Sequence, residues 1–381
     1  MAKPLNIALL GTKFMGKAHS NAWLTVDEFF SVPRPPVRHT VVGRDVVDLE
    51  EFADCWGWQQ WTTDWKAAVT DPEIDLVDIG TSNDVHAEQS IAALEAGKHV
   101  ACEKPLARTL DESRQMVQAA KASKAQTFVW YNYRRVPAVA LAHQLVKEGR
   151  LGRIYHVRAT YLQSWGGPDT PLSWRFQSKL AGSGANGDIM AHIIDMARFV
   201  TGDEFTEVTG AIEERFIKER PLVDDPKRKA RSSVDDAVLF LGRFKGGAVA
   251  SFEASRLATG VKNSNRIEVH GEKGAIRFNF ERMNELEYFD ASVEPRLQGW
   301  QTIQTMHEEH PYAADWWPDG HWLGYEHTFV NQAADILRAI SRRKVVVPLP
   351  DFADAYQTAR VMEAAILSAR NRTPVRLSEV K

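Results

Sequence analysis

The chain has 381 residues, of which 44% are hydrophobic and 25% charged, and this length exceeds what one hydrophobic core usually serves, so we expect two domains. A formal net charge of −3 offers no attraction for nucleic acid or an anionic membrane surface, and no apolar run is long enough to span a bilayer. Because residues 1–4 lack the apolar core of a signal peptide and Cys55 and Cys102 belong to no pairing motif, we expect a cytoplasmic protein with two reduced, buried thiols.

The first 130 residues alternate short apolar runs with helical patterns, which is typical of a parallel sheet flanked by helices. Helices are predicted from about Met15 to before Pro33, over 86–96 and from Thr109 onward. Strands are predicted at 5–10, 40–42, 74–79, 99–102 and 127–130. We therefore predict an α/β domain over residues 1–130.

The pattern changes after residue 130. A helix is predicted from Pro137 to Gly149, with proline at its start and glycine just past its end. Strand-like runs then follow at 154–161, 238–244, 248–254, 266–270 and 275–278, and polar loops at 224–229 and 320–325. These runs favour an α+β domain over residues 131–381, with a large, mostly antiparallel sheet and helices on one face.

A glycine-rich turn, Gly11-Thr12-Lys13-Phe14-Met15-Gly16, follows the first strand and opens a helix. In a dinucleotide-binding turn, helix N-terminal amides meet the pyrophosphate. Lys13 stands where the middle glycine is usual, so its side chain points outward or supplies positive charge nearby. The alternative is a tight turn between strand and helix that binds no ligand.

The end of the second strand usually discriminates between the two nicotinamide cofactors. An acidic residue there binds the ribose diol, whereas an arginine accommodates a 2′-phosphate. Arg44 and Asp45 offer both. We expect NAD, from Asp45, with NADP also possible.

Lysine, aspartate and histidine occur in two places where proton-transfer chemistry is expected. Lys104 comes at the end of the predicted strand at 99–102, where ligands bind in open α/β sheets, and Pro105 restricts it to an extended backbone. Asp188 and His192 are four residues apart and share a helical face. An ammonium, a carboxylate and an imidazole can move a proton while a hydride moves the other way. The alternatives are a solvated lysine and a surface hydrogen bond; a metal site lacks a third ligand, so we expect none.

Four segments occur in an order that resembles the glucose–fructose oxidoreductase / inositol dehydrogenase / MocA family over essentially the whole chain. They are Gly11 to Gly16, Glu103-Lys104-Pro105, Asn132-Tyr133-Arg134, and Gly187-Asp188 through His192 to Asp195. Residues 16–22 and 161–165 are similar to the pyranoside, anhydrosugar and inositol dehydrogenases of that family. The resemblance implies a Rossmann NAD(P)-binding domain and a second domain for substrate binding and oligomerisation, in a homo-oligomer that is a tetramer or dimer.

The resemblance also implies residue roles. Lys104, Asp188 and His192 are implied to be catalytic, Asp195 to support them, and the Lys104–Pro105 bond to be cis. Cofactor contacts are implied for Gly11, Lys13, Phe14, Met15, Gly16, Arg44, Asp45, Thr81, Asn83, His86, Glu103, Lys104, Asn132, Trp174 and Arg175. Substrate contacts are implied for Lys104, Tyr131, Gln163, Trp165, Asp188, His192 and Tyr325. Aromatic faces suit pyranose rings and side-chain amides suit hydroxyls, although core packing explains the aromatic residues equally well.

The implied activity is NAD(P)-linked oxidation of a ring hydroxyl of a sugar, anhydrosugar, glycoside or cyclitol to a ketone. His192 would take the hydroxyl proton while Lys104 stabilises the developing alkoxide, or Lys104 would itself transfer the proton. One alternative is an NAD-dependent glycosidase that works by transient oxidation and elimination. Another is a non-catalytic sugar- or cofactor-sensing protein on the same fold, because fold alone does not set function.

Overall fold

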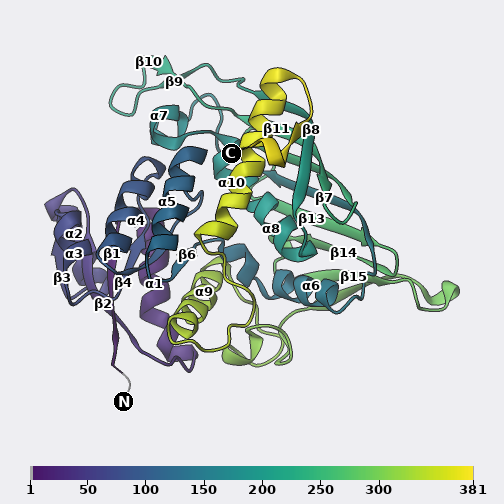
Figure 1. Ribbon diagram of the computed structural model, residues 1–381, viewed down its shortest axis with the longest axis horizontal. Helices are drawn as coiled ribbons and strands as arrows, with labels where there is room; N and C mark the ends of the chain where they lie inside the picture. The colour runs from purple at the N-terminus through teal and green to yellow at the C-terminus, as the bar shows by residue number, and fades with distance from the viewer. Residues whose placement is uncertain (1–2, 381) are drawn as a thin grey trace. The chain divides into compact units, whose positions relative to one another are not determined.

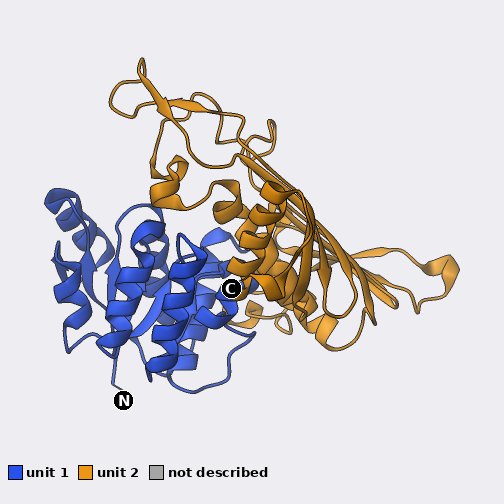
Figure 2. Cartoon of the chain, turned by 45° about the horizontal axis from the view of Figure 1, so that its top comes forward, with its two compact units in different colours: residues 1–135, 323–356 blue, residues 136–322, 357–381 orange. Residues whose placement is uncertain are grey.

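The computed structural model describes residues 3–380, and these form two compact units (Figure 2). One unit contains the residues up to 135 together with 323–356; the other contains 136–322 and the residues from 357 onward. The division therefore differs from the expected single boundary at residue 130, because a late segment rejoins the first unit. Helix α9 (Tyr325–Ile340) lies in that segment and packs against α1 (Phe14–Phe29).

Unit 1 is built on a parallel sheet with strand order β3-β2-β1-β4-β5-β6 (Figure 1). This order reverses direction between β1 and β4, which is the switch point where doubly wound folds bind dinucleotides. The strands are β1 (Leu5–Leu10), β2 (Pro36–Val42), β3 (Gln60–Thr62), β4 (Leu76–Ile79), β5 (His99–Cys102) and β6 (Thr127–Val129). The connecting helices are α1, α2 (Val46–Trp56), α3 (Trp65–Thr70), α4 (His86–Glu95) and α5 (Leu110–Ala122).

Unit 2 is built on a sheet with strand order β16-β15-β14-β13-β7-β12-β11-β8-β17. The pairing of β7 with β12 is parallel and the other pairings are antiparallel. The strands are β7 (Ile154–Leu162), β8 (Phe205–Glu214), β11 (Ala237–Phe244), β12 (Val249–Ser255), β13 (Ser264–Gly271), β14 (Gly274–Asn279), β15 (Glu285–Asp290), β16 (Trp300–Gln304) and β17 (Val375–Arg376). A separate hairpin joins β9 (Glu219–Pro221) to β10 (Lys229–Arg231).

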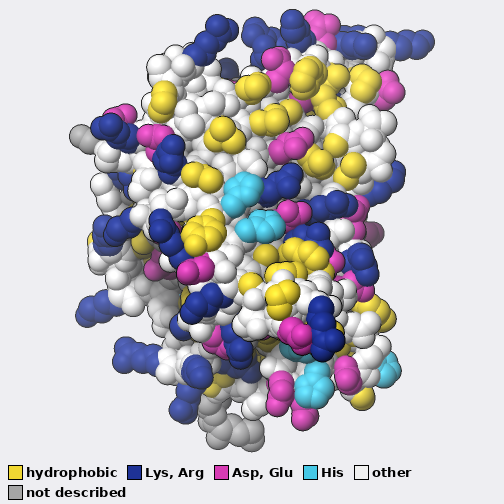
Figure 3. Space-filling view, turned by 90° about the vertical axis from the view of Figure 1, so that its right-hand side faces the viewer, with side chains coloured by type: hydrophobic (Ala, Val, Ile, Leu, Met, Phe, Trp, Pro, Cys, Tyr) yellow, Lys and Arg dark blue, Asp and Glu magenta, His cyan; other side chains and the backbone are white. Residues whose placement is uncertain are grey.

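Helices cover one face of this sheet. Helix α8 (Ala191–Thr201) packs on β7 and β13, and α6 (Pro137–Lys147) packs on β14 and β15. The short α7 (Ser178–Ala181) and the long α10 (Phe352–Asn371) complete the helices. Residues on β11 alternate between buried and exposed, as expected for a strand with one covered face. Figure 3 views the molecule from the side on which this sheet lies in Figure 1, and hydrophobic side chains gather there between basic and acidic ones.

The predicted fold class is confirmed: a Rossmann unit and a second unit with a large, mostly antiparallel sheet. Strands β8, β15 and β16 were not predicted from the sequence, because charged or polar residues interrupt their apolar patterns. Tyr325 begins α9 instead of ending a loop. The thiol of Cys102 is buried as expected, but Cys55 is exposed on α2. Across residues 3–380, no helix is long and apolar enough to cross a membrane.

Candidate active site

The turn after β1 requires glycine at both ends. Gly11 has φ of +110°, and a Cβ there would lie 2.7 Å from the Gly80 carbonyl oxygen. A Cβ on Gly16 would lie 2.2 Å from the Gly11 carbonyl oxygen. These close approaches bring the N-terminus of α1 against the ends of β1 and β4, as a dinucleotide-binding turn requires. The residues present therefore fit a nicotinamide dinucleotide.

Lys13 replaces the middle glycine without entering the turn. Its ammonium group lies 2.9 Å from the Asp48 carboxylate on α2, and its side chain is 83% exposed. The side chain thus points outward, which is one of the two orientations expected from the sequence. The next residue, Phe14, is exposed and stacks on Tyr325 of α9, with ring centroids 6.2 Å apart. This stacking joins a predicted cofactor residue to a predicted substrate residue within unit 1.

Asp45, which follows β2, is the N-cap residue of α2. Its Oδ1 accepts hydrogen bonds from the backbone amides of Val47 at 3.1 Å and Asp48 at 3.2 Å, so it caps the N-terminus of α2. Arg44 is exposed beside it. Both side chains lie at the strand end where a ribose is bound in this fold.

His86 joins two strand-end loops. Its Nδ1 lies 3.1 Å from the Pro105 carbonyl oxygen and its Nε2 lies 3.2 Å from the Thr81 carbonyl oxygen. The side chain is fully buried, and burial lowers the pKa of His86. This position favours support of the loops over direct cofactor contact. Asn83 is also buried, and the Asn132 side-chain amide donates to Thr328 at 2.7 Å.

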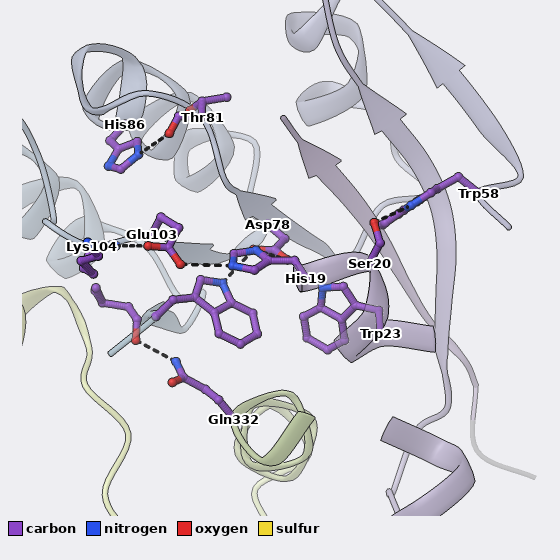
Figure 4. Close-up of polar contacts among 12 residues, drawn as sticks. His19, Ser20, Trp23, Trp58, Asp78, Thr81, His86, Glu103, Lys104 and Gln332 are labelled. Atoms are coloured by element: carbon purple, nitrogen blue, oxygen red, sulfur yellow. Dashed lines mark hydrogen bonds and ion pairs between the residues drawn. The ribbon is translucent and has the colours of Figure 1, made fainter. Parts of the chain in front are cut away.

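Lys104 lies two residues beyond the end of β5, and the Lys104–Pro105 peptide bond is cis, as the resemblance implies. Lys104 is half-buried, and its backbone amide donates to Glu103 Oε2 at 3.0 Å. The other Glu103 oxygen, Oε1, lies 3.2 Å from Nε2 of His19 (Figure 4). The predicted catalytic lysine is therefore linked through one carboxylate to a histidine that sequence reasoning did not assign to the site.

Asp188 and His192 occupy an irregular helix start in unit 2. Residues Asn186–Met190 form a π-helical segment that continues directly into α8. Such segments are rare and occur frequently at functional sites. The buried carboxylate of Asp235 fixes this start, because it accepts from the amides of Gly184 at 2.6 Å and Asn186 at 2.8 Å. Burial raises the pKa of Asp235.

Arg256 provides a charged partner for Asp188. Its Nε lies 3.4 Å from Asp188 Oδ2, and the arginine side chain is 1% exposed whereas that of Asp188 is 25% exposed. The guanidinium carbon also lies over the rings of Trp165, at 5.2 Å, and Phe176, at 5.6 Å. Sequence reasoning missed Arg256, although it follows a predicted strand just as Lys104 does.

A chain of hydrogen bonds joins two of the predicted substrate residues of unit 2, Gln163 and Trp165. Trp165 Nε1 donates to Gln163 Oε1 at 2.6 Å, and the Gln163 amide donates to Asn263 Oδ1 at 2.7 Å. The Tyr161 hydroxyl donates to the same Asn263 oxygen at 2.8 Å, and its ring meets that of His192 edge-on at 5.8 Å. We call Tyr161, Gln163, Trp165 and Asn263 the amide–aromatic strip. It brings together two predicted residues with two that were missed.

The remaining predicted residues are placed as follows. Arg175 lies over the Trp174 ring at 4.6 Å, and its carbonyl oxygen accepts from Arg256 at 3.2 Å. Tyr131, directly after β6, is 2% exposed, and Asp195 on α8 is equally buried. Over residues 3–380, no group of three or more His, Cys, Asp or Glu side chains is arranged to hold a metal ion.

Comparison with known proteins identifies the class to which these features belong. Residues 5–131 match the family described as oxidoreductase family, NAD-binding Rossmann fold, and residues 139–277 match the GFO/IDH/MocA C-terminal domain. Together these matches cover more than half of the chain. The protein therefore belongs to the GFO/IDH/MocA family of NAD-dependent oxidoreductases.

Three individual proteins are similar over nearly the full length. Levoglucosan dehydrogenase of Pseudarthrobacter phenanthrenivorans is 43% identical over 99% of each chain. The crystal structure of an oxidoreductase domain protein from Kribbella flavida is 46% identical, with a TM-score of 0.95 over 99% of this chain and 100% of that one. The structure of a levoglucosan dehydrogenase in complex with NADH and L-sorbose is 44% identical, with a TM-score of 0.94 over 99% of each chain.

Proposed function

We propose that the protein oxidises a ring hydroxyl of a sugar, anhydrosugar, glycoside or cyclitol to the ketone, with NAD⁺ as the preferred hydride acceptor. The observation that carries the proposal is the amide–aromatic strip, whose Tyr161 contacts His192 and whose Trp165 lies beside Arg256, the partner of Asp188. Side-chain amides bind hydroxyls, and aromatic faces suit the apolar faces of sugar rings. Full-length similarity to levoglucosan dehydrogenase, whose structure with NADH also holds L-sorbose, supports the same substrate class.

Three residues carry the proposed chemistry, with His192 accepting the proton of the substrate hydroxyl. When bound, NAD⁺ would accept the hydride from the substrate carbon that bears this hydroxyl. Lys104 donates a hydrogen bond to the reacting oxygen and stabilises the negative charge that develops on it. Asp188, whose carboxylate pairs with Arg256, holds a neighbouring hydroxyl or the imidazole in place. The strip supplies further hydrogen bonds that orient the ring.

A substrate screen tests the proposal directly. Pyranoses, anhydrosugars and inositols are incubated with NAD⁺ or NADP⁺ while the absorbance of the reduced cofactor is followed. The proposal expects turnover of at least one ring alcohol, with the higher kcat/KM for NAD⁺. Cleavage of an aryl glycoside without net NADH release would instead indicate the glycosidase. Sugar binding without any turnover would indicate a sensing protein.

We further propose a homo-oligomer, a tetramer or dimer, assembled through the open face of the unit 2 sheet. Exposed apolar side chains lie on neighbouring strands there: Ile212 is 58% exposed, Leu241 53% and Val249 43%. Contiguous exposed apolar surface of this kind marks interaction sites. Light scattering tests the assembly. Leu241→Arg should lower the mass, whereas Val223→Arg, on a loop residue that is 71% exposed, should not.

We also propose a cytoplasmic location, which the cysteines support. Among residues 3–380 neither Cys55 nor Cys102 forms a disulfide, and reduced thiols are the rule in that compartment. Cell fractionation of the producing organism is the measurement. Recovery in a secreted or membrane fraction would contradict the proposal.

A further inference from the structure

A closed cluster of charged side chains lies behind the Lys104 turn in unit 1. His19 on α1 is fully buried between Asp78 of β4 and Glu103 at the end of β5 (Figure 4). Its Nδ1 lies 3.1 Å from both oxygens of Asp78, and its Nε2 lies 3.2 Å from Oε1 of Glu103. Neither His19 nor Asp78 has a role in the catalysis proposed above.

The geometry favours a proton on both ring nitrogens of His19. A neutral imidazole has one N–H, so its other nitrogen would place a lone pair against a carboxylate oxygen. Asp78 also accepts from the indole N–H groups of Trp23 at 2.7 Å and Trp130 at 2.8 Å, and these groups can only donate. Glu103 accepts from the Lys104 amide in the same way. Every one of these neighbours therefore fits ionised carboxylates around an imidazolium.

The electrostatics of the cluster agree with this geometry. Burial by itself would lower the pKa of His19, but the negative charge of Asp78 and the hydrogen bonds to Asp78 and Glu103 outweigh it and raise the pKa to about 9. The cluster then holds two negative charges and one positive charge. The His19 ring also contacts two aromatic rings, with the Trp130 centroid at 4.4 Å and the Phe329 centroid at 5.7 Å.

We propose that His19 is a positioning residue for Lys104. As an imidazolium, His19 fixes the Glu103 carboxylate and, through that carboxylate, the Lys104 main chain. The inference rests on the proposed function, because Lys104 is there the group that binds the reacting oxygen. One Glu103 oxygen contacts His19 and the other contacts the Lys104 amide. Loss of the imidazolium leaves Glu103 Oε1 without its partner His19, so the carboxylate can rotate. Glu103 Oε2 then no longer holds the Lys104 amide in position.

The net charge of the cluster predicts which second substitution should compensate for the loss of His19. His19→Gln leaves two carboxylates with no internal cation, which is costly in a buried site. Adding Glu103→Gln returns the net charge of the cluster to −1 and lets two amides hydrogen-bond each other. His19→Gln should therefore be worse than the double variant in any property that depends on the position of Lys104.

The first experiment measures turnover of the carbohydrate that the wild-type enzyme oxidises. His19→Gln should lower kcat about tenfold or more, since small misplacements of a reacting group are costly, and should leave KM within about threefold. His39→Gln is the matched control, because His39 is also buried in unit 1 and lies 3.5 Å from the Glu73 carboxylate. It should change little. Equal kcat in wild type and His19→Gln would overturn the inference.

The second experiment needs no substrate. NMR of ring-labelled histidine, assigned with His19→Gln, should show a charged imidazolium at neutral pH that titrates near pH 9. NMR of ¹³C-methylated Lys104 should show a changed chemical shift in His19→Gln, partly restored in the double variant, and unchanged in His39→Gln. A neutral His19, or an unmoved Lys104 signal, overturns the inference even where folding of a variant is impaired. Absence of carbohydrate turnover by the wild type would instead defeat the proposed function alone.

Discussion

The two units hold their charged groups in opposite ways. In unit 1, the side chains of His19, Asp78 and Glu103 are 0%, 0% and 5% exposed, and the carboxylates and imidazole contact each other. In unit 2, the Arg256 side chain is 1% exposed but its partner Asp188 is 25% exposed. A closed cluster can only set geometry and stability, whereas a carboxylate with a buried partner and an open side can also meet a ligand.

Because the cluster in unit 1 is closed and the pair in unit 2 is partly exposed, we expect mutations in the two to have different effects. Removing one member of the closed cluster leaves an uncompensated buried charge, so stability and position should suffer together. Removing Arg256 should affect catalysis more than folding, because solvent reaches the Asp188 carboxylate that remains. Each prediction below tests one side of this contrast.

The largest expected effect is a loss of stability with rising pH. A histidine whose pKa rises from 6.5 to about 9 on folding stabilises fully below pH 6.5, and this contribution is lost as pH rises through about 9. The shift corresponds to on the order of 3 kcal/mol. Urea unfolding at several pH values measures it, as the difference between wild type and His19→Gln. A difference that stays constant across this window would show that His19 is not charged in the folded protein.

Lys104 and His192 should have the next largest effects, on rate. Lys104→Ala and His192→Ala should each lower kcat about 10²-fold or more, the usual scale for a positioned acid or base, while NADH affinity changes little. If both groups act on one proton and one oxygen, as proposed, the double variant should be little worse than the poorer single variant. Lys121→Ala, on an exposed lysine of α5, is the control. Near-wild-type kcat of His192→Ala from about pH 6 to about pH 10 would make Lys104 or a water the proton acceptor.

Arg256 should have a smaller catalytic effect, because it acts through Asp188. Arg256→Ala removes the buried partner of that carboxylate, so kcat/KM should fall about tenfold. Arg256→Lys should recover part of this, since it restores the charge but not the planar group over Trp165. Arg338 is a matched control: it lies 3.6 Å from Asp335 and 5.5 Å over the Phe30 ring. An Arg338→Ala variant that loses as much activity would contradict a specific role for Arg256.

The sequence predicted those parts of the site that lie next to strong local signals. The turn from Gly11 to Gly16 follows an apolar strand, and Lys104 follows another, so the parallel sheet by itself places both at strand ends. Asp188 and His192 were found from their spacing. For Asp78 a signal existed but was not used, since an aspartate inside a fully buried strand must have partners.

Other parts depend on contacts that have no local signature. Arg256 and Asn263 lie beside β12 and β13, and they come together with Tyr161 and Gln163 because β7 pairs with both of those strands. The π-helical segment Asn186–Met190 carries no sequence pattern that distinguishes a π-helix, so only the backbone reveals it. The return of residues 323–356 to unit 1 could not be predicted either, because an amphipathic helix does not specify which sheet it covers.

The smallest effect should come from Asp45, and it separates a structural from a cofactor role. Asp45 Oδ1 caps α2 through two backbone amides, and Asp64 caps α3 in the same way, with bonds of 2.9 and 3.1 Å from Lys66 and Ala67. Replacing either with alanine should cost about 1 kcal/mol of stability. Only Asp45→Ala is expected also to lower the ratio of kcat/KM for NAD⁺ over NADP⁺, because Asp45 follows β2, the strand at whose end this fold places an acidic residue for the ribose. If Asp64→Ala lowered the ratio equally, loss of stability would explain both changes; if neither did, Arg44 or another residue would set the cofactor preference.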